Sequence, residues 1–144
     1  MIRKATPYDR DALVDMALLL WGHHDAAELR DELEALLSDK EAAIFIASDG
    51  ENEIGFAQAQ LRHDYVEGTH SSPVGYLEGI FVREAYRERG VARALVEACE
   101  AWAKEKGCAE FASDCELTNE QSRAFHLRVG FQEANRIICF TKQL

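Results

Sequence analysis

The sequence has no apolar stretch close to the roughly 20 residues that a membrane-spanning helix needs. Its first residues, Met1-Ile2-Arg3-Lys4, lack the apolar core of a signal peptide. Internal repeats, low-complexity tracts and linkers are also missing. These absences argue against a membrane protein, a repeat array and a multidomain chain. We therefore expect one globular domain over residues 1–144, located in the cytoplasm.

Paired cysteines are absent as well. The four cysteines form no Cys-x-x-Cys pair and show no zinc spacing; they are Cys99, Cys108, Cys115 and Cys139. We expect them to stay unbonded and to pack as small apolar side chains. His23-His24 suggests a metal, but no further His or Cys lies at ligand spacing, so no metal is expected.

Basic residues are scarce, with 16 Lys and Arg against 26 Asp and Glu and a net charge of -10. Residues 1–60 hold thirteen acids and five bases, whereas residues 61–144 hold thirteen and eleven. An acidic surface repels nucleic acid and anionic membranes and attracts cations. The charge therefore indicates a cationic small-molecule substrate and neither nucleic acid nor membrane as partner, although acidic residues also serve solubility alone.

Hydrophobic periodicity and turn residues predict an alternation of strands and helices. Strands are expected at 1–5, 42–48, 54–64, 74–82 and 110–114, with a terminal strand or pair of strands at 131–142. Helices are expected at 7–20, 25–37, 91–107 and 120–129. The second to fourth strands form an antiparallel meander, and the strand–helix–strand unit after them is a right-handed crossover. The expected fold class is α/β, with a mixed, mostly antiparallel sheet, helices on both faces and a parallel pair formed by the fourth and fifth strands.

The segment Arg87-Glu88-Arg89-Gly90-Val91-Ala92 joins an expected strand to an expected helix. Gly90 lets the backbone approach a ligand closely, and a helix start offers unpaired N–H groups and the positive end of its dipole to an anion. Four arginines crowd this turn: Arg83, Arg87, Arg89 and Arg93. Neither Gly-x-Gly-x-x-Gly nor Gly-Lys-Ser/Thr occurs. The turn is either a phosphate site of another type or an ordinary helix start with solvated arginines.

Two carboxylates occupy unusual places in the expected sheet. Glu78 lies inside the apolar strand at 74–82, and Asp114 ends the strand that should run parallel beside it. Adjacent strand ends can present both acids to a cationic amine, and one of them can take the amine proton directly or through water. The alternative is a pair of buried acids that accept hydrogen bonds from backbone amides.

With Arg87, Gly90 and Ala92 at its fixed positions, the turn resembles the pyrophosphate signature Arg/Gln-x-x-Gly-x-Gly/Ala of the GNAT family of N-acetyltransferases. The order of expected elements matches that fold over nearly the whole chain. The resemblance implies acetyl-CoA as cosubstrate, its pyrophosphate on the turn and its pantetheine arm paired with the fourth strand. The implied cofactor-binding residues are Ile80, Phe81, Val82, Arg87, Glu88, Arg89, Gly90, Val91, Ala92, Arg93 and Asn119.

A second family signature resembles the segment from Asn119 through Ser122, Phe125 and His126 to Gly130-Phe131. In the family this Asn hydrogen-bonds the pantetheine arm, a role that is compatible with helix capping. Family members often place Tyr four residues before the Gly, where it protonates the leaving thiolate. His126 holds that position here and is the implied proton donor, with a packed histidine as the alternative.

Three motifs resemble the aminoglycoside 6′-N-acetyltransferase subgroup: Leu20-Trp21-Gly22-His23-His24-Asp25, His63-Asp64-Tyr65-Val66-Glu67-Gly68 and Leu77-Glu78-Gly79-Ile80-Phe81-Val82. The implied substrate site joins aromatic faces for sugar rings with carboxylates for ammonium groups. Its residues are Trp21, His24, Tyr65, Glu78, Asp114 and Asn135. Asn135 departs from the subgroup, because some members carry Glu there.

The resemblance implies direct acetyl transfer from acetyl-CoA to the 6′-amine of aminoglycosides, which confers resistance, with Glu78, Asp114 and His126 as candidate catalytic residues. The same chemistry on a polyamine or a protein N-terminus is the nearest alternative. A non-catalytic acyl-CoA-binding sensor is another, although a sensor requires no acidic and aromatic acceptor site. The apolar terminal run Ile137-Ile138-Cys139-Phe140 has no element after it in the sequence that could cover it. Related aminoglycoside enzymes often pair or exchange such terminal strands, so the resemblance implies a homodimer.

Overall fold

The structure, a computed structural model, describes residues 1–22 and 24–144. Its centre is one five-stranded sheet in the order β1-β2-β3-β4-β5. The strands are β1 (Ile2–Lys4), β2 (Ala42–Asp49), β3 (Asn52–Arg62), β4 (Val74–Val82) and β5 (Phe111–Ser113). All neighbours are antiparallel except β4 and β5, which run parallel. This mixed sheet confirms the predicted fold class.

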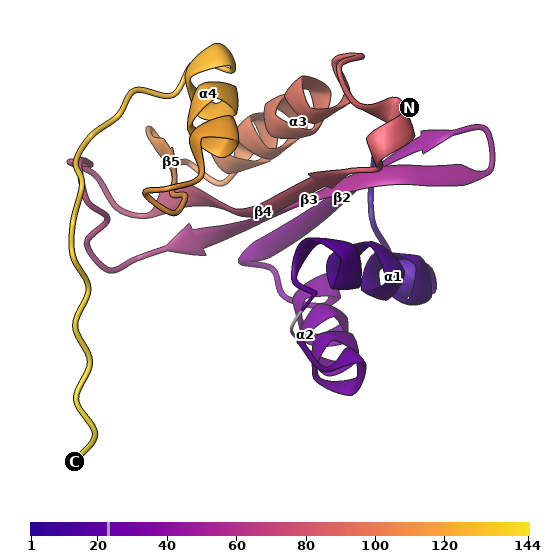
Figure 1. The fold of residues 1–144 in the computed structure, drawn as a ribbon, viewed down its shortest axis with the longest axis horizontal. Helices are drawn as coiled ribbons and strands as arrows, with labels where there is room; N and C mark the ends of the chain where they lie inside the picture. Colours follow the sequence, from indigo (N-terminus) through magenta and orange to yellow (C-terminus); the bar gives the residue numbers. More distant parts are fainter. Residues whose placement is uncertain (23) are drawn as a thin grey trace.

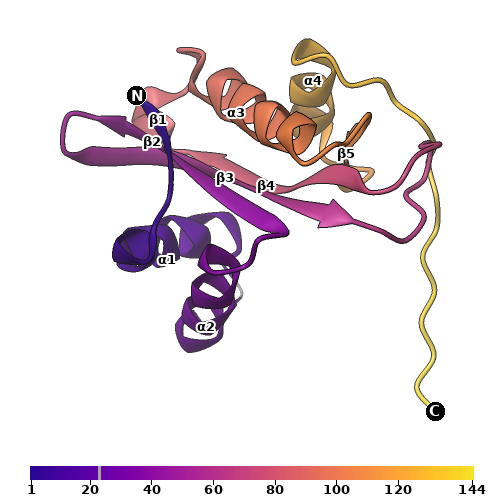
Figure 2. The ribbon, with the colours of Figure 1, turned by 180° about the vertical axis from the view of Figure 1, so that it is seen from behind.

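Helices cover both faces of the sheet. They are α1 (Arg10–Leu20), α2 (Ala26–Leu37), α3 (Val91–Glu105) and α4 (Glu120–Arg128), with short 3-10 helices η1 (Pro7–Asp9) and η2 (Glu84–Tyr86). Figures 1 and 2 show α1 and α2 on one face and α3 and α4 on the other. Within the described chain, none of the helices combines the length and apolarity that crossing a bilayer requires.

The entry into α1 is fixed by the carboxylate of Asp9. It accepts two hydrogen bonds from the Arg3 guanidinium, both at 2.8 Å, and one from the Thr6 N–H at 2.9 Å. These bonds from Arg3 and Thr6 hold the pKa of Asp9 down at about 2. The helix that the sequence predicts from residue 7 therefore begins as the 3-10 turn η1, and the ion pair of Arg3 with Asp9 connects β1 to the start of α1.

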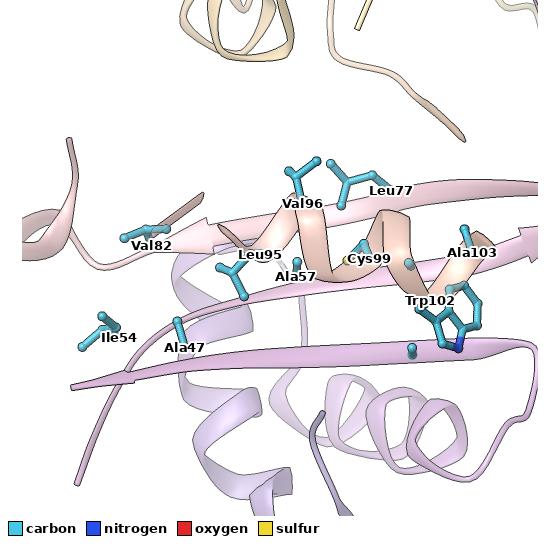
Figure 3. Packing of buried hydrophobic residues seen from close by; sticks show 12 residues of the cluster. Ala47, Ile54, Ala57, Leu77, Val82, Leu95, Val96, Cys99, Trp102 and Ala103 are labelled. Atoms are coloured by element: carbon cyan, nitrogen blue, oxygen red, sulfur yellow. The ribbon is translucent and has the colours of Figure 1, made fainter. Parts of the chain in front are cut away.

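The core on the α3 face depends on small residues of the sheet. α3 buries one stripe at helical spacing: Leu95, Val96, Cys99, Trp102 and Ala103. Figure 3 shows this stripe lying on the strands, where Ala47 and Ala57 leave room for the helix. The opposite face packs larger side chains against α1 and α2, among them Ile44, Ile46 and Phe56. Both faces of the central strands are thus buried, which makes the sheet a rigid support.

The terminal strand predicted at 131–142 is wrong for the single chain. Residues 132–144 form no regular element, and the last of them leave the body as an extended run (Figure 1). Ile137, Ile138 and Phe140 are 65%, 80% and 88% exposed. β5 pairs with β4 along one edge and has only three residues. Its other edge is therefore too short to pair with the tail of the same chain.

Candidate active site

The arginine-rich turn lies at a helix start as predicted, but η2 is inserted between it and β4. Gly90 is the N-cap residue of α3 and adopts φ of 82°, in the left-handed region. The first intrahelical bond joins the Ala94 N–H to the Gly90 carbonyl at 3.1 Å. The N–H groups of residues 91–93 therefore point out of the helix end, and no side chain in the described part of the chain caps it. This end is suited to an anion.

Two arginines of the turn are anchored to backbone carbonyls. Arg87 Nε donates to the Val82 carbonyl at 2.8 Å, and Arg93 Nη2 donates to the Arg128 carbonyl at the end of α4 at 2.7 Å. Arg89 is exposed. A guanidinium carries five N–H donors, so the anchored side chains are held in place and keep donors for an anion.

β4 has an open edge where β5 ends. The two strands pair only along Gly75–Leu77 and Phe111–Ser113. β4 is accordingly buried over Val74–Leu77 and only half-buried over Glu78–Phe81. Along this second stretch, no strand of the described residues covers the edge that β5 leaves. An extended ligand can therefore pair with the β4 backbone there.

Glu78 occupies an irregularity at the start of this open stretch. In the pairing of β3 with β4, Gln58 lies opposite Gly79 and Ala59 lies opposite Leu77, so the register skips Glu78. Such a bulge bends the strand and re-aims the side chain of its extra residue. The bulge explains how an acid within an apolar strand reaches a polar site.

Arg62 connects Glu78 to the second acid through Tyr76. Its Nε and Nη2 donate to the Glu78 carboxylate at 2.7 to 2.9 Å, and its Cζ lies 3.4 Å from the centroid of the Tyr76 ring. The Tyr76 hydroxyl donates to Asp114 Oδ2. Burial and the bond to Asp114 raise the pKa of Tyr76, so the phenol stays protonated. The acids of two adjacent strands thus share one network, but through side chains and not through backbone amides.

A pocket lies beside the bulge, between the sheet and the helices α1 and α2. Its volume is about 190 Å³, and its lining is Trp21, His24, Leu29, Glu32, Leu33, Leu36, Gln58 and Glu78. Trp21 ends α1, and a Cβ added at Gly79 would come within 2.6 Å of its indole. Only glycine lets the indole lie this close to β4. The centroid of the His24 ring is 6.3 Å from the centroid of the Trp21 ring. Aromatic faces beside the carboxylates of Glu32 and Glu78 suit a cation that carries rings.

Two predicted substrate residues lie apart from this pocket. Tyr65 is 75% exposed in the loop after β3, where its hydroxyl accepts from the Gly68 N–H at 3.4 Å. Asn135 Nδ2 donates to Glu67 Oε1 at 2.9 Å. The single chain therefore gathers Trp21, His24 and Glu78 at the pocket and Asp114 in the adjoining network, without Tyr65 and Asn135.

The possible metal site of the sequence involved His23, which lies outside the described residues. In residues 1–22 and 24–144, no three His, Cys, Asp or Glu side chains are grouped so that they could hold a metal ion.

α4 carries the residues of the second signature. Asn119 is its N-cap, and Asn119 Oδ1 accepts from the Ser122 N–H at 3.0 Å, which leaves the Nδ2 group for a ligand. His126 Nδ1 lies 2.7 Å from the Ser122 carbonyl oxygen, and its Nε2 lies 2.8 Å from Ser113 Oγ of β5. His126 thus has polar partners on both ring nitrogens.

The sequence reasoning missed several residues of the site: Glu32, Gln58, Arg62, Tyr76 and Ser113. Tyr76 precedes Glu78 by two positions and shares its face of the strand, so strand alternation was a usable signal. Arg62 had no such signal, because its contact with Glu78 depends on the register of β3 against β4 and on the bulge.

Comparison with known proteins shows the family of this chain. Residues 10–131 match the model of the Acetyltransferase (GNAT) family. An aminoglycoside N(6')-acetyltransferase type 1 of Stenotrophomonas maltophilia is 46% identical over 145 residues, which cover 99% of this chain and 93% of the relative. A protein of the same name from Salmonella typhimurium is 47% identical over 125 residues, 86% of each chain.

Solved structures agree with these relatives. AAC(6')-Iy in complex with the bisubstrate analogue CoA-S-monomethyl-acetylneamine has a TM-score of 0.97 at 39% identity, over 100% of this chain and 98% of that one. The 6'-N-acetyltransferase AAC(6')-IG of Acinetobacter haemolyticus has a TM-score of 0.95 at 38% identity, over 100% and 99% of the two chains. The chain therefore belongs to the GNAT acetyltransferase family and, within it, to the group of aminoglycoside N(6')-acetyltransferases.

Proposed function

We propose that this protein transfers the acetyl group of acetyl-CoA to the 6′-amine of aminoglycosides and thereby confers resistance to them. One observation carries the proposal: β4 joins two complementary features at Glu78–Phe81. Its edge is open for an extended cofactor, and the same stretch borders the pocket with Trp21 and Glu78. The names of the relatives supply the substrate class, and the carboxylates of Glu32 and Glu78 in the pocket agree with a cationic substrate.

The cofactor would lie along β4 and end on the arginine turn. The N–H groups at the start of α3 and the side chains of Arg87 and Arg89 would hold the pyrophosphate of CoA. The pantetheine arm would pair with the backbone of Ile80–Val82 as an added strand, and Asn119 Nδ2 would donate to one of its carbonyls. A β4 N–H would stabilise the oxyanion that forms at the thioester carbonyl, so the chemistry requires no metal.

The two acids offer different partners to the substrate amine. Glu78 already binds the guanidinium of Arg62, whereas the partner of Asp114 is the neutral hydroxyl of Tyr76. An ammonium group gains more from a carboxylate whose charge is uncompensated. We therefore assign the amine to Asp114, which would take its proton directly or through water, and assign Glu78 to the ring-binding pocket.

Two of the four cysteines are poor nucleophiles, which agrees with direct transfer without an acetyl-enzyme. Cys99 is buried in the core, and burial raises the pKa of its thiol to about 12, so the nucleophilic thiolate is not available. Burial also raises the pKa of Cys108. All four cysteines are free thiols, which suits the reducing cytoplasm, where we place the enzyme.

A thiol-release assay across amines tests this function. Drugs with a free 6′-amine, such as kanamycin and tobramycin, should be turned over well, and spermidine poorly, because a polyamine has no ring face to stack on Trp21. Good turnover of spermidine without turnover of either drug would replace the aminoglycoside by a polyamine. Binding of acetyl-CoA without thiol release for any amine would favour a sensor.

The exposed tail points to a second copy of the chain. Residues 132–144 carry an apolar run that the described part of the protomer leaves largely exposed. Pairing or exchange of these segments between two protomers would give them the partner strands that β5 is too short to provide. The protein is then a homodimer. Sedimentation at micromolar concentration should give a dimer, and a chain that ends at residue 131 should sediment as a monomer.

A further inference from the structure

A serine and a histidine lie against each other on the α3 and α4 face of the sheet, opposite the acid network. Ser113 is the last residue of β5, and its Oγ lies 2.8 Å from Nε2 of His126 on α4. Ser113 Oγ is also 3.3 Å from the Leu77 carbonyl of β4. Both side chains are half-buried, so the protein partly excludes water from them and a ligand can still reach them.

The proton positions of this pair follow from its partners. His126 Nδ1 lies 2.7 Å from the Ser122 carbonyl, which only accepts hydrogen bonds, so Nδ1 carries a proton. In the neutral ring Nε2 then accepts from the Ser113 hydroxyl. In the imidazolium form Nε2 donates to Ser113 Oγ, and the hydroxyl proton turns to the Leu77 carbonyl or to an incoming acceptor.

The pair is located where the cofactor edge begins. Leu77 is the partner of Ser113 in the register, and it is the last β4 residue that β5 covers. An extended ligand that follows the open edge from the arginine turn therefore meets Ser113 Oγ at its far end. That end of acetyl-CoA carries the thioester sulfur.

We infer that Ser113 is the acid that protonates the leaving thiolate of CoA, with His126 as the positioning residue that supplies its proton. This inference rests on the proposed path of the cofactor along β4. When the carbon–sulfur bond of the tetrahedral intermediate breaks, the electron pair goes to sulfur, and sulfur takes the Ser113 hydroxyl proton. Ser113 Oγ simultaneously takes the Nε2 proton of the His126 imidazolium. The neutral ring keeps its Nδ1 proton, which it donates to the Ser122 carbonyl, and regains the Nε2 proton from solvent.

The test compares single-turnover acetyl transfer with cofactor affinity. Ser113→Ala should slow transfer to kanamycin by about 10²-fold, the usual effect of losing a general acid, and should leave calorimetric CoA affinity within about twofold. Ser113→Thr keeps the hydroxyl on a strand-compatible residue and should restore most of the rate. Ser48→Ala, at a half-buried serine of β2, is the matched control and should transfer at the wild-type rate.

His126→Gln adds a second, independent arm. A glutamine can hydrogen-bond Ser113 but cannot pass on a proton, so this variant should lose about as much rate as Ser113→Ala. The double variant should lose no more than either single one, because both residues act in one step. A wild-type transfer rate in Ser113→Ala, or an acetyl group on Ser113 in the mass spectrum after incubation with acetyl-CoA alone, would overturn the inference.

The leaving thiol is the same for every amine, so these measurements do not depend on the aminoglycoside assignment. If spermidine proves to be the substrate, the variants are compared with spermidine and the same pattern is expected. Failure of the wild type to bind CoA would instead reject the proposed cofactor path.

Discussion

The proposed cofactor site and the proposed acceptor site border the same strand, but they are built from different groups. At the arginine turn the ligand-binding groups are backbone N–H donors of α3, left open by the φ of 82° at Gly90. At the acceptor site they are side chains that already have partners: Arg62 on Glu78 and Tyr76 on Asp114. The N–H donors of the cofactor site are open to a ligand, whereas the side chains of the acceptor site already bind one another.

This difference indicates how each site responds to its ligand. An anion at the helix start meets donors that need no rearrangement, so binding there depends mainly on backbone shape. An ammonium group at the acids must share carboxylates that already accept hydrogen bonds, and each bond to a charged group contributes about 1.5–3 kcal/mol. Arg62 and Tyr76 therefore weaken the attraction of the two acids for any simple cation. A cation that carries rings gains further binding free energy from the pocket around Trp21.

The largest effect is expected from breaking the backbone site. Gly90→Asp adds a Cβ at positive φ and a negative charge where the pyrophosphate would bind, so the variant should lose measurable CoA binding by calorimetry. Gly107→Asp is the matched control at the other end of the same helix, with φ of 88° and equally open surroundings. It should carry the same strain and keep CoA affinity. Equal affinities in the two variants would reject the phosphate site.

The next effect separates the two acids. Asp114→Asn should lower kcat/KM for kanamycin by about 10²-fold, because it removes the proposed proton acceptor. Glu78→Gln should lower it by only about fivefold, since Arg62 already neutralises this carboxylate. Initial rates across kanamycin concentrations measure both.

Tyr76→Phe sharpens the same comparison. It keeps the ring beneath Arg62 and deletes only the hydrogen bond to Asp114. Its effect should therefore be smaller than that of Asp114→Asn. A larger loss in Glu78→Gln than in Asp114→Asn would exchange the roles of the two acids.

The contrast between the sites also explains what the sequence could predict. The arginine turn is a contiguous segment whose Gly and helix start follow from local rules, so the sequence alone predicts it. The acid network depends on the register of β3, on a bulge and on the short strand β5, which are non-local features. Glu78 and Asp114 are recognisable in the sequence as unusual residues, whereas their partners Arg62 and Tyr76 are not.

The tail shows the opposite limit of sequence reasoning. The apolar run near Phe140 has the composition of a strand, and its local pattern therefore predicts one. Strand formation also needs a neighbouring backbone, and β5 offers only three residues within one chain. The composition of a segment does not show whether a neighbouring strand is long enough to pair with it.

A smaller effect is expected at the aromatic groups of the acceptor site. Trp21→Ala should weaken kanamycin use by about 1–2 kcal/mol in kcat/KM, because the indole is a wall of the pocket. Tyr65→Ala should have less effect, since Tyr65 is 75% exposed and lies apart from the pocket. Raising the salt concentration should raise KM in both variants as in the wild type. An equal loss in both would bring Tyr65 back into the site, as the sequence predicts.

The smallest effect on function is expected at the ion pair Arg3–Asp9, which joins a guanidinium to a carboxylate as Arg62–Glu78 does. We expect Arg3–Asp9 to stabilise the fold and to have no effect on activity at neutral pH. Asp9 has a pKa of about 2 beside Arg3, below the roughly 3.9 of an unfolded chain. Because the pKa is lower in the folded state, the pair stabilises above about pH 4, and this stability is lost as pH falls from about 4 to 2.

Asp9→Asn should therefore lower the free energy of unfolding at pH 7 by about 1–2 kcal/mol. This value includes a reduction for solvent screening, because the Arg3 side chain is 42% exposed. The variant should also lose less stability than the wild type between pH 7 and pH 3. Asp11→Asn is the control, since that side chain is 72% exposed in its pair with Arg30 and water screens it. Urea unfolding at pH 7 and pH 3 measures both variants, with kcat/KM at pH 7 unchanged. Equal stabilities would show that the Arg3–Asp9 pair does not fix the entry of α1. A lower kcat/KM of Asp9→Asn at full stability would show that Asp9 acts on the substrate.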